Sequence, residues 1–184
     1  DNNGMVGAGV YICGSQNGKA SLEMTGGDIN NNSITNMGKY GCDGGGIYAK
    51  YTEVNAEGKE NDRISISHNG IKDFGVDYNP SQSSGGGIYA EKSTVNLNHV
   101  IIDDNTASGN NAQGGAGIWA EDSDVTVKNG SISNNQGGKL NQNVYGGALR
   151  VEGSGNVHVE AVTFEKNCVS PESDYQWNIG YGGA

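Results

Sequence analysis

Gly85-Gly86-Gly87-Ile88-Tyr89-Ala90 is the stretch that decides the fold, because near-copies of it recur along the chain. Each copy begins with small residues and continues with an apolar residue, which an aromatic residue follows in four of the five copies. The copies are Gly7–Ile12, Gly44–Ala49, Gly85–Ala90, Gly115–Ala120 and Gly146–Val151. Self-similarity of this kind indicates a repeat architecture in which each unit stacks on its neighbours.

A second marker follows each Gly-rich copy and consists of an apolar residue, two polar residues and an asparagine. Both markers recur at a common period of about 30 to 40 residues. The asparagines are Asn32, Asn69, Asn105, Asn135 and Asn167. Asparagine tolerates the left-handed backbone of a sharp corner, and its amide both donates and accepts hydrogen bonds. We therefore expect these residues to be left-handed at a corner of each unit and to bond along the stack as a structural column.

Between the two markers lies a segment in which apolar and polar residues alternate, the pattern of a half-buried strand. Its first apolar residues are Leu22, Val54, Val95, Val125 and Val157. In four of the five units this residue stands seven positions before the apolar member of the asparagine marker. The exception carries five extra residues within the polar run Glu57–Arg63, which indicates a loop.

Each unit therefore holds three short strands separated by turns, the longest of which run from the asparagine to the next Gly-rich strand. Three strands per unit predict a three-sided coil, and stacked coils predict a right-handed parallel β-helix of about five coils. The predicted interior columns are Val10, Ile47, Ile88, Ile118 and Leu149; Leu22, Val54, Val95, Val125 and Val157; and Ile29, Ile66, Ile102, Ile132 and Phe164. We expect a single β-helix domain over residues 1–184, as a piece of a longer repeat protein, since the chain starts and stops within a unit.

Composition and charge exclude several classes of function. The chain has 184 residues, 32 glycines and 34% hydrophobic residues, which fits a thin core built from repeats. A formal charge of −10 would repel a phosphate backbone, so nucleic acid is not expected as a partner. The cysteines lack the spacing of a metal site and have no histidine partners at ligand spacing, so no metal and no cofactor are predicted. They are Cys13, Cys42 and Cys168.

The alternation of a Gly-Gly-Ala-apolar motif with a Phe-x-x-Asn motif resembles the repeats of polymorphic outer-membrane proteins. The resemblance is closest where Gly146–Leu149 is followed by Phe164–Asn167, and the other units have Ile in place of Phe. The passenger domains of that family resemble autotransporter adhesins. The resemblance implies a bacterial, extracellular or surface-displayed protein that attaches to a host or cell-surface glycan or protein.

Binding on a solenoid comes from outward columns and from loops. The outward column of the Gly-rich strands is Tyr11, Tyr48, Tyr89, Trp119 and Arg150. These rings, with Arg150 over the face of Trp119, are a candidate platform for sugar rings, and the alternative is that their stacking only stabilises the sheet. Loop aromatics are further candidate ligand-binding residues, unless they fold down to shield the core. They are Phe74, Tyr78, Tyr175 and Trp177.

Two other classes of protein remain open. One is a polysaccharide lyase or glycoside hydrolase, since β-helices include both and such chemistry needs converging carboxylates. The one adjacent acid pair on a strand is Asp103-Asp104, and neighbouring units have no acids at the matching positions, so a non-enzymatic protein is favoured. The other class is a structural stalk or spacer of a surface protein. Its open ends predict contact with neighbouring repeats of the same chain or end-to-end self-association.

Overall fold

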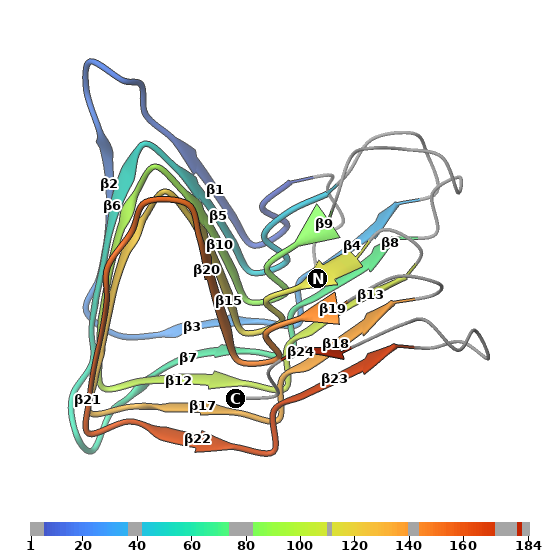
Figure 1. Ribbon diagram of the computed structural model, residues 1–184. Helices are drawn as coiled ribbons and strands as arrows, with labels where there is room; N and C mark the ends of the chain where they lie inside the picture. The colour runs from blue at the N-terminus through green and yellow to red at the C-terminus, as the bar shows by residue number, and fades with distance from the viewer. Residues whose placement is uncertain are drawn as a thin grey trace.

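The computed structural model is a stack of coils built from parallel strands, which Figure 1 shows one behind another. The structure describes residues 6–36, 42–73, 83–109, 112–139, 144–171 and 180–181. Every element in these ranges is a β-strand. Each strand of a middle coil pairs in parallel with the equivalent strands of the coils before and after it, and the strands of the end coils pair on one side. The predicted fold class, a parallel β-helix of about five coils, is confirmed.

Three five-stranded sheets form the triangular body seen in Figure 1. The first sheet holds the Gly-rich strands β1 (Val10–Cys13), β5 (Ile47–Lys50), β10 (Ile88–Glu91), β15 (Ile118–Glu121) and β20 (Leu149–Glu152). The second sheet holds β2 (Ala20–Met24), β6 (Thr52–Glu57), β11 (Thr94–Asn98), β16 (Asp124–Lys128) and β21 (Val157–Glu160). The third sheet holds β3 (Asp28–Asn30), β7 (Ile64–Ser67), β12 (Val100–Asp103), β17 (Ser131–Ser133) and β22 (Thr163–Glu165).

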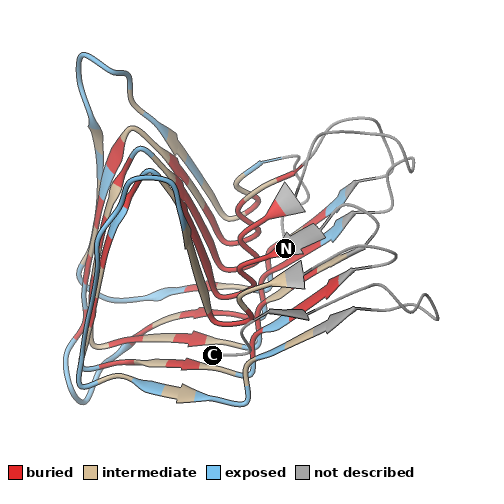
Figure 2. Ribbon diagram, viewed as in Figure 1, coloured by how far each residue is buried: buried red, intermediate tan, exposed pale blue. Residues whose placement is uncertain are grey.

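The apolar columns of these three sheets meet inside the triangle and form one core. Strand pairing places the members of each predicted interior column opposite one another, so all three columns are confirmed. In the three middle coils these side chains are buried, and Figure 2 shows buried residues, in red, along the sides of the triangle. Full burial of one Val or Ile side chain contributes about 1.5–3 kcal/mol. In the last coil Val157 is 46% exposed, because a coil covers it on one side only.

The segments expected to be long turns contain two further sheets, which form an arm beside the triangle in Figure 1. The fourth sheet holds β4 (Ser33–Asn36), β8 (Gly70–Asp73), β13 (Thr106–Gly109), β18 (Gln136–Lys139) and β23 (Cys168–Pro171). The fifth sheet holds β9 (Ser83–Ser84), β14 (Ala112–Gly114), β19 (Val144–Tyr145) and β24 (Gly180–Tyr181). Many of these strand residues are small and polar, with weak β propensity. They pair because backbone bonds continue from coil to coil, as from Thr106 N–H to the Asn69 carbonyl at 2.9 Å.

Several corners of each coil are made by a single residue with left-handed backbone. Next to the asparagine column these residues have φ between 52° and 58°, and they are Asn31, His68, Asp104, Asn134 and Lys166. The expectation that the column asparagines themselves are left-handed is therefore wrong by one position. The turn occurs one residue earlier, at an exposed side chain, and the asparagine that follows directs its amide into the coil.

The five-residue insertion of the second coil forms a tight hairpin. Lys59 and Asp62 exchange two backbone hydrogen bonds, at 2.9 and 3.0 Å. Gly58, just before the hairpin, lies against the next coil, since a Cβ atom there would meet the His99 carbonyl oxygen at 2.5 Å. The strands on both sides keep their register with that coil, so the extra residues project from the corner and leave the body unchanged.

Candidate functional site: an aromatic column and a polar groove

The asparagine column is a closed hydrogen-bond ladder inside the stack. In the first four coils the amide Nδ2 donates to the Oδ1 of the asparagine in the next coil, at 2.9–3.1 Å. The same Oδ1 accepts the backbone N–H of the preceding asparagine, at 3.0–3.1 Å. Nδ2 of Asn105 also donates to the Ile66 carbonyl at 2.9 Å. In the three middle coils the second hydrogen of each Nδ2 donates to the backbone carbonyl of an isoleucine. Every hydrogen-bonding group of these amides is therefore used inside the protein, and none is available to a ligand.

A second polar ladder, between the first and second sheets, was not predicted. It consists of Thr52, Ser93 and Ser123, which are buried. Ser93 Oγ accepts the Thr52 backbone N–H at 3.0 Å and donates to the Glu91 carbonyl at 2.8 Å. Ser123 Oγ accepts the Ser93 backbone N–H at 2.9 Å in the same way. In these coils the hydroxyl residue stands two positions before the inward valine, and this spacing is the signal that could have revealed the ladder.

The aromatic column lies in register on the first sheet. Tyr11 stacks on Tyr48 with ring centroids 5.1 Å apart and planes 7° from parallel, and Tyr48 stacks on Tyr89 at 5.3 Å and 11°. The ring faces of these tyrosines therefore cover one another along the stack, and the Tyr89 hydroxyl donates to Glu121 Oε2 at 3.1 Å. This geometry differs from a platform of open ring faces on which sugar rings stack. Tyr11, in the first coil, is 57% exposed.

The other half of the column is closed by Arg150. Its guanidinium carbon lies 3.9 Å from the centroid of the Trp119 ring and 4.3 Å from that of Tyr145 in β19. Nη2 of Arg150 donates to Glu152 at 2.8 Å. Trp119 is 4% exposed and Tyr89 is 8% exposed. Arg150 thus lies between the first and fifth sheets, where it covers the buried Trp119 ring and contacts the half-buried Tyr145 ring.

The other predicted candidates are dispersed or fall outside the described residues. Phe74, Tyr78, Tyr175 and Trp177 belong to the segments that the structure does not describe. Asp103 Oδ1 accepts hydrogen bonds from Ser133 and Asn134, both at 2.7 Å. Within the described ranges, no group of three or more His, Cys, Asp or Glu side chains is placed to hold a metal ion.

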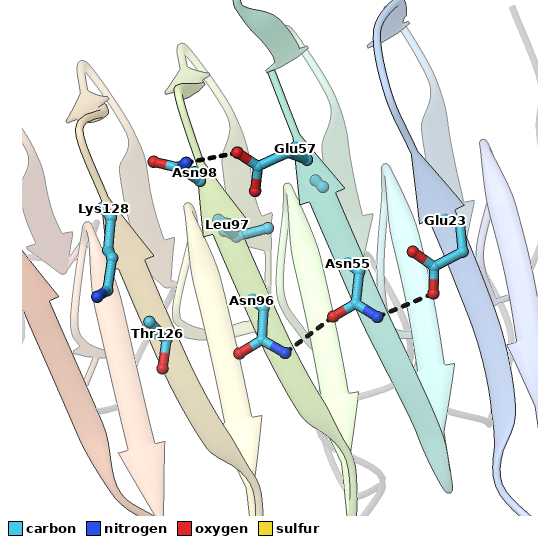
Figure 3. A pocket seen from close by; sticks show the side chains of 9 residues that line it. Glu23, Asn55, Glu57, Asn96, Leu97, Asn98, Thr126 and Lys128 are labelled. Atoms are coloured by element: carbon cyan, nitrogen blue, oxygen red, sulfur yellow. Dashed lines mark hydrogen bonds between the residues drawn. The ribbon is translucent and has the colours of Figure 1, made fainter. Parts of the chain in front are cut away.

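A polar groove on the outer face of the second sheet is a site that sequence reasoning missed. It has a volume of about 400 Å³ and runs across neighbouring strands, as Figure 3 shows. Its lining residues are Glu23, Asn55, Ala56, Glu57, Asn96, Leu97, Asn98, Thr126 and Lys128. The polar members alternate with the buried residues of the same strands, so the period of two that predicted the core also marks these outward positions.

Two rows of side chains line this groove, and the first contains Asn96, Asn55 and Glu23. Asn96 Nδ2 donates to Asn55 Oδ1 at 2.8 Å, and Asn55 Nδ2 donates to Glu23 Oε1 at 2.8 Å. Hydrogen bonds from Asn55 and then Ser21 lower the pKa of Glu23, so this carboxylate is ionised at neutral pH. Within the described part of the chain, Asn96 Oδ1 and the Thr126 hydroxyl have no hydrogen-bond partner.

The second row runs beside the first. Asn129 Nδ2 donates to Asn98 Oδ1 at 2.9 Å, and Asn98 Nδ2 donates to Glu57 Oε1 at 2.6 Å. Lys128 continues the row and pairs with Glu160 at 2.9 Å. The groove therefore offers amide, hydroxyl, ammonium and carboxylate groups, most of them already oriented by a neighbour. Amide, hydroxyl and carboxylate groups of this kind can exchange hydrogen bonds with the hydroxyl groups of a ligand.

The structure defines the class of the protein as a repeat parallel β-helix, and it carries a groove with mostly polar lining residues on the outer face of its second sheet. No protein-family model, curated protein or solved structure matches the chain. Among the residues that the structure describes, none forms a helix long and apolar enough to cross a membrane.

Proposed function

We propose that this chain is a non-enzymatic recognition segment of an extracellular surface protein and that it binds a glycan in the polar groove of the second sheet. The proposal rests on the row of Glu23, Asn55 and Asn96, which fixes polar side chains along the axis and leaves Asn96 Oδ1 facing the groove. Sugar hydroxyls both donate and accept hydrogen bonds, so they complement amides and carboxylates alike.

The dimensions of the groove suit an extended chain. Its lining comes from four successive coils, from Glu23 in the first to Thr126 in the fourth. Since paired strands lie about 4.8 Å apart, three spacings give a length of about 14 Å. The lining amides are held by their neighbours, so binding costs little side-chain freedom.

Surface location is supported by the resemblance of Gly146–Leu149 and Phe164–Asn167 to repeats of polymorphic outer-membrane proteins. Passengers of that family resemble autotransporter adhesins, which favours attachment to a cell-surface glycan over a soluble ligand. A net charge of −10, with Glu23 and Glu57 in the groove, disfavours a densely anionic polymer. The proposed ligand is therefore a neutral or sparsely charged glycan.

Binding of the purified chain to a glycan array and to host-type cells tests this function. The double variant Asn55→Ala/Asn96→Ala should weaken glycan binding about tenfold or more, because it removes the row without touching the core. The matched control is Ser65→Ala, a polar residue of the third sheet that is not among the lining residues. A loss on Tyr48→Ser with the groove variant unaffected would move the binding surface to the aromatic column. Shortened glycans after incubation would identify an enzyme.

A structural stalk is the second candidate function, and the aromatic column favours it. Its rings stack on one another, and Arg150 covers Trp119, so much of the column serves contacts within the protein. A stalk presents other parts of its chain and binds nothing itself. Absence of binding to every glycan and cell type, by a chain with an intact β-sheet circular dichroism spectrum, would support this second function over the first.

A further inference from the structure

A second groove lies where the second and third sheets meet, around the corner from the first. It has a volume of about 440 Å³. Its polar lining residues are Glu60, Arg63, His99, Asn129, Ser131 and Thr163. These residues come from coils two to five, so this groove also extends along the axis.

The hairpin of the second coil builds one end of this corner groove. In the next two coils a single left-handed residue makes the corner, namely His99 with φ 52° and Asn129 with φ 51°. The second coil has the hairpin there instead, and it contributes Glu60 and Arg63 to the lining. Arg63 follows the closed hairpin directly, and the next residue, Ile64, donates its N–H to the His99 carbonyl at 3.2 Å. The backbone of Arg63 is thus held on both sides.

Arg63 is the group in this groove that can bind an anion. It is exposed, and no described carboxylate forms an ion pair with it, including Glu60 in the same groove. The chain has one other arginine, Arg150, which is paired with Glu152. A guanidinium binds a carboxylate through two parallel hydrogen bonds, and the hydroxyl and amide groups around Arg63 complement the rest of a sugar.

The two grooves adjoin each other. Asn129 lines the corner groove and donates to Asn98 of the first groove at 2.9 Å. His99 and Asn98 are consecutive residues, one in each groove. A glycan that lies along the second sheet therefore has a neighbouring residue or branch within reach of the corner.

We propose that the corner groove binds a carboxylate-bearing sugar residue, with Arg63 as the residue that recognises the carboxylate. This inference deepens the proposed function, on which it rests, by naming an acidic sugar as part of the glycan. One unpaired guanidinium among nearby carboxylates selects an isolated negative charge, because a polymer of closely spaced charges would be repelled by Glu57 and Glu60. Sialic and uronic acids both supply the required carboxylate.

Nuclear magnetic resonance of the ¹⁵N-labelled chain tests the site directly. Free N-acetylneuraminate, free glucuronate and neutral N-acetylglucosamine are titrated separately, and the arginine Nε–H signals are followed. With two arginines in the chain, Arg150 serves as an internal control. We expect the Arg63 signal to shift with one or both acidic sugars, and not with the neutral sugar, while Arg150 stays in place. Which acid causes the larger shift distinguishes the two sources of the carboxylate, and no shift with either acid would overturn the inference.

The glycan array separates this inference from the proposed function. Arg63→Gln should weaken binding of acidic glycans about tenfold or more and leave neutral glycans unchanged. Lys59→Gln is the matched control, since it removes one positive charge from the same hairpin at a residue outside the lining. Equal losses for the two variants would show a general charge effect and overturn the role of Arg63. Binding without preference for acidic glycans would overturn the inference and leave the proposed function standing. A shift of Arg63 with acidic sugars, but no glycan binding on the array, would support the inference and overturn the proposed function.

Discussion

Replacing Asn105 with alanine tests whether the amide ladder holds the coils together. The side chain is 0% exposed and makes four hydrogen bonds. Its Oδ1 accepts the backbone N–H of Asn69 at 3.0 Å and the Nδ2 of Asn69 at 3.1 Å. Its Nδ2 donates to Ile66 at 2.9 Å and to Asn135 at 3.0 Å. Alanine therefore leaves two donor hydrogens of buried Asn69 without an acceptor.

An unpaired buried donor costs about 1–3 kcal/mol, so Asn105→Ala should lower the free energy of unfolding by about 2–6 kcal/mol. Asn96→Ala is the matched control, because Asn96 lies on the outer face and makes one hydrogen bond. It should cost less than about 1 kcal/mol. Urea unfolding followed by circular dichroism measures both variants. Equal destabilisation of the two would refute the argument that the buried ladder stabilises the stack.

Three further predictions concern the second polar ladder, the Gly-rich strands and the aromatic column. Ser93→Ala removes the acceptor of the buried Thr52 N–H and should cost about 1–3 kcal/mol in urea unfolding; an unchanged midpoint would contradict this. Gly87→Ala places a Cβ atom 2.5 Å from the Gly117 carbonyl oxygen, so a loss of at least about 1 kcal/mol is expected, and an unchanged Tm in calorimetry would count against it. Burial raises the pKa of Tyr48 to about 12, so the folded state holds this proton more tightly than the unfolded chain. Stability should fall as pH rises from about 10 to 12, and Tyr48→Phe should weaken that fall; an identical pH profile would refute it.

The triangular body was predictable because local patterns carry its information. Strict alternation places Val54 and Val95 inward, and the paired markers fix the period, so the register followed from the sequence alone. The left-handed corner was misplaced because asparagine often takes that backbone, whereas here His68 takes it and Asn69 supplies the amide. Asparagine prefers left-handed backbone, but its amide must also reach the hydrogen bonds of the ladder. The ladder determined which residue is left-handed.

The arm and the two grooves were beyond local reasoning. A strand such as Thr106–Gly109 has little tendency to form by itself, and it exists because the coil beneath offers backbone partners. The outward residues of the second sheet could be named, yet that Asn96 and Asn55 bond to each other along a groove depends on side-chain packing between coils. The corner groove depends on the hairpin before Arg63. The length and charge of that segment predicted a loop and no more.

The hairpin at residues 59–62 is also a place where additional residues can be inserted into the chain. Gly58 and Ile64 are fixed to the next coil on either side of it, so additions between them pass no strain into the strands. A foreign peptide grafted between Lys59 and Asp62 would be displayed at a fixed place, with both ends already close together. The strands of the solenoid can therefore stay constant while the corner loops change, and the corner of one coil can change without changes in the others.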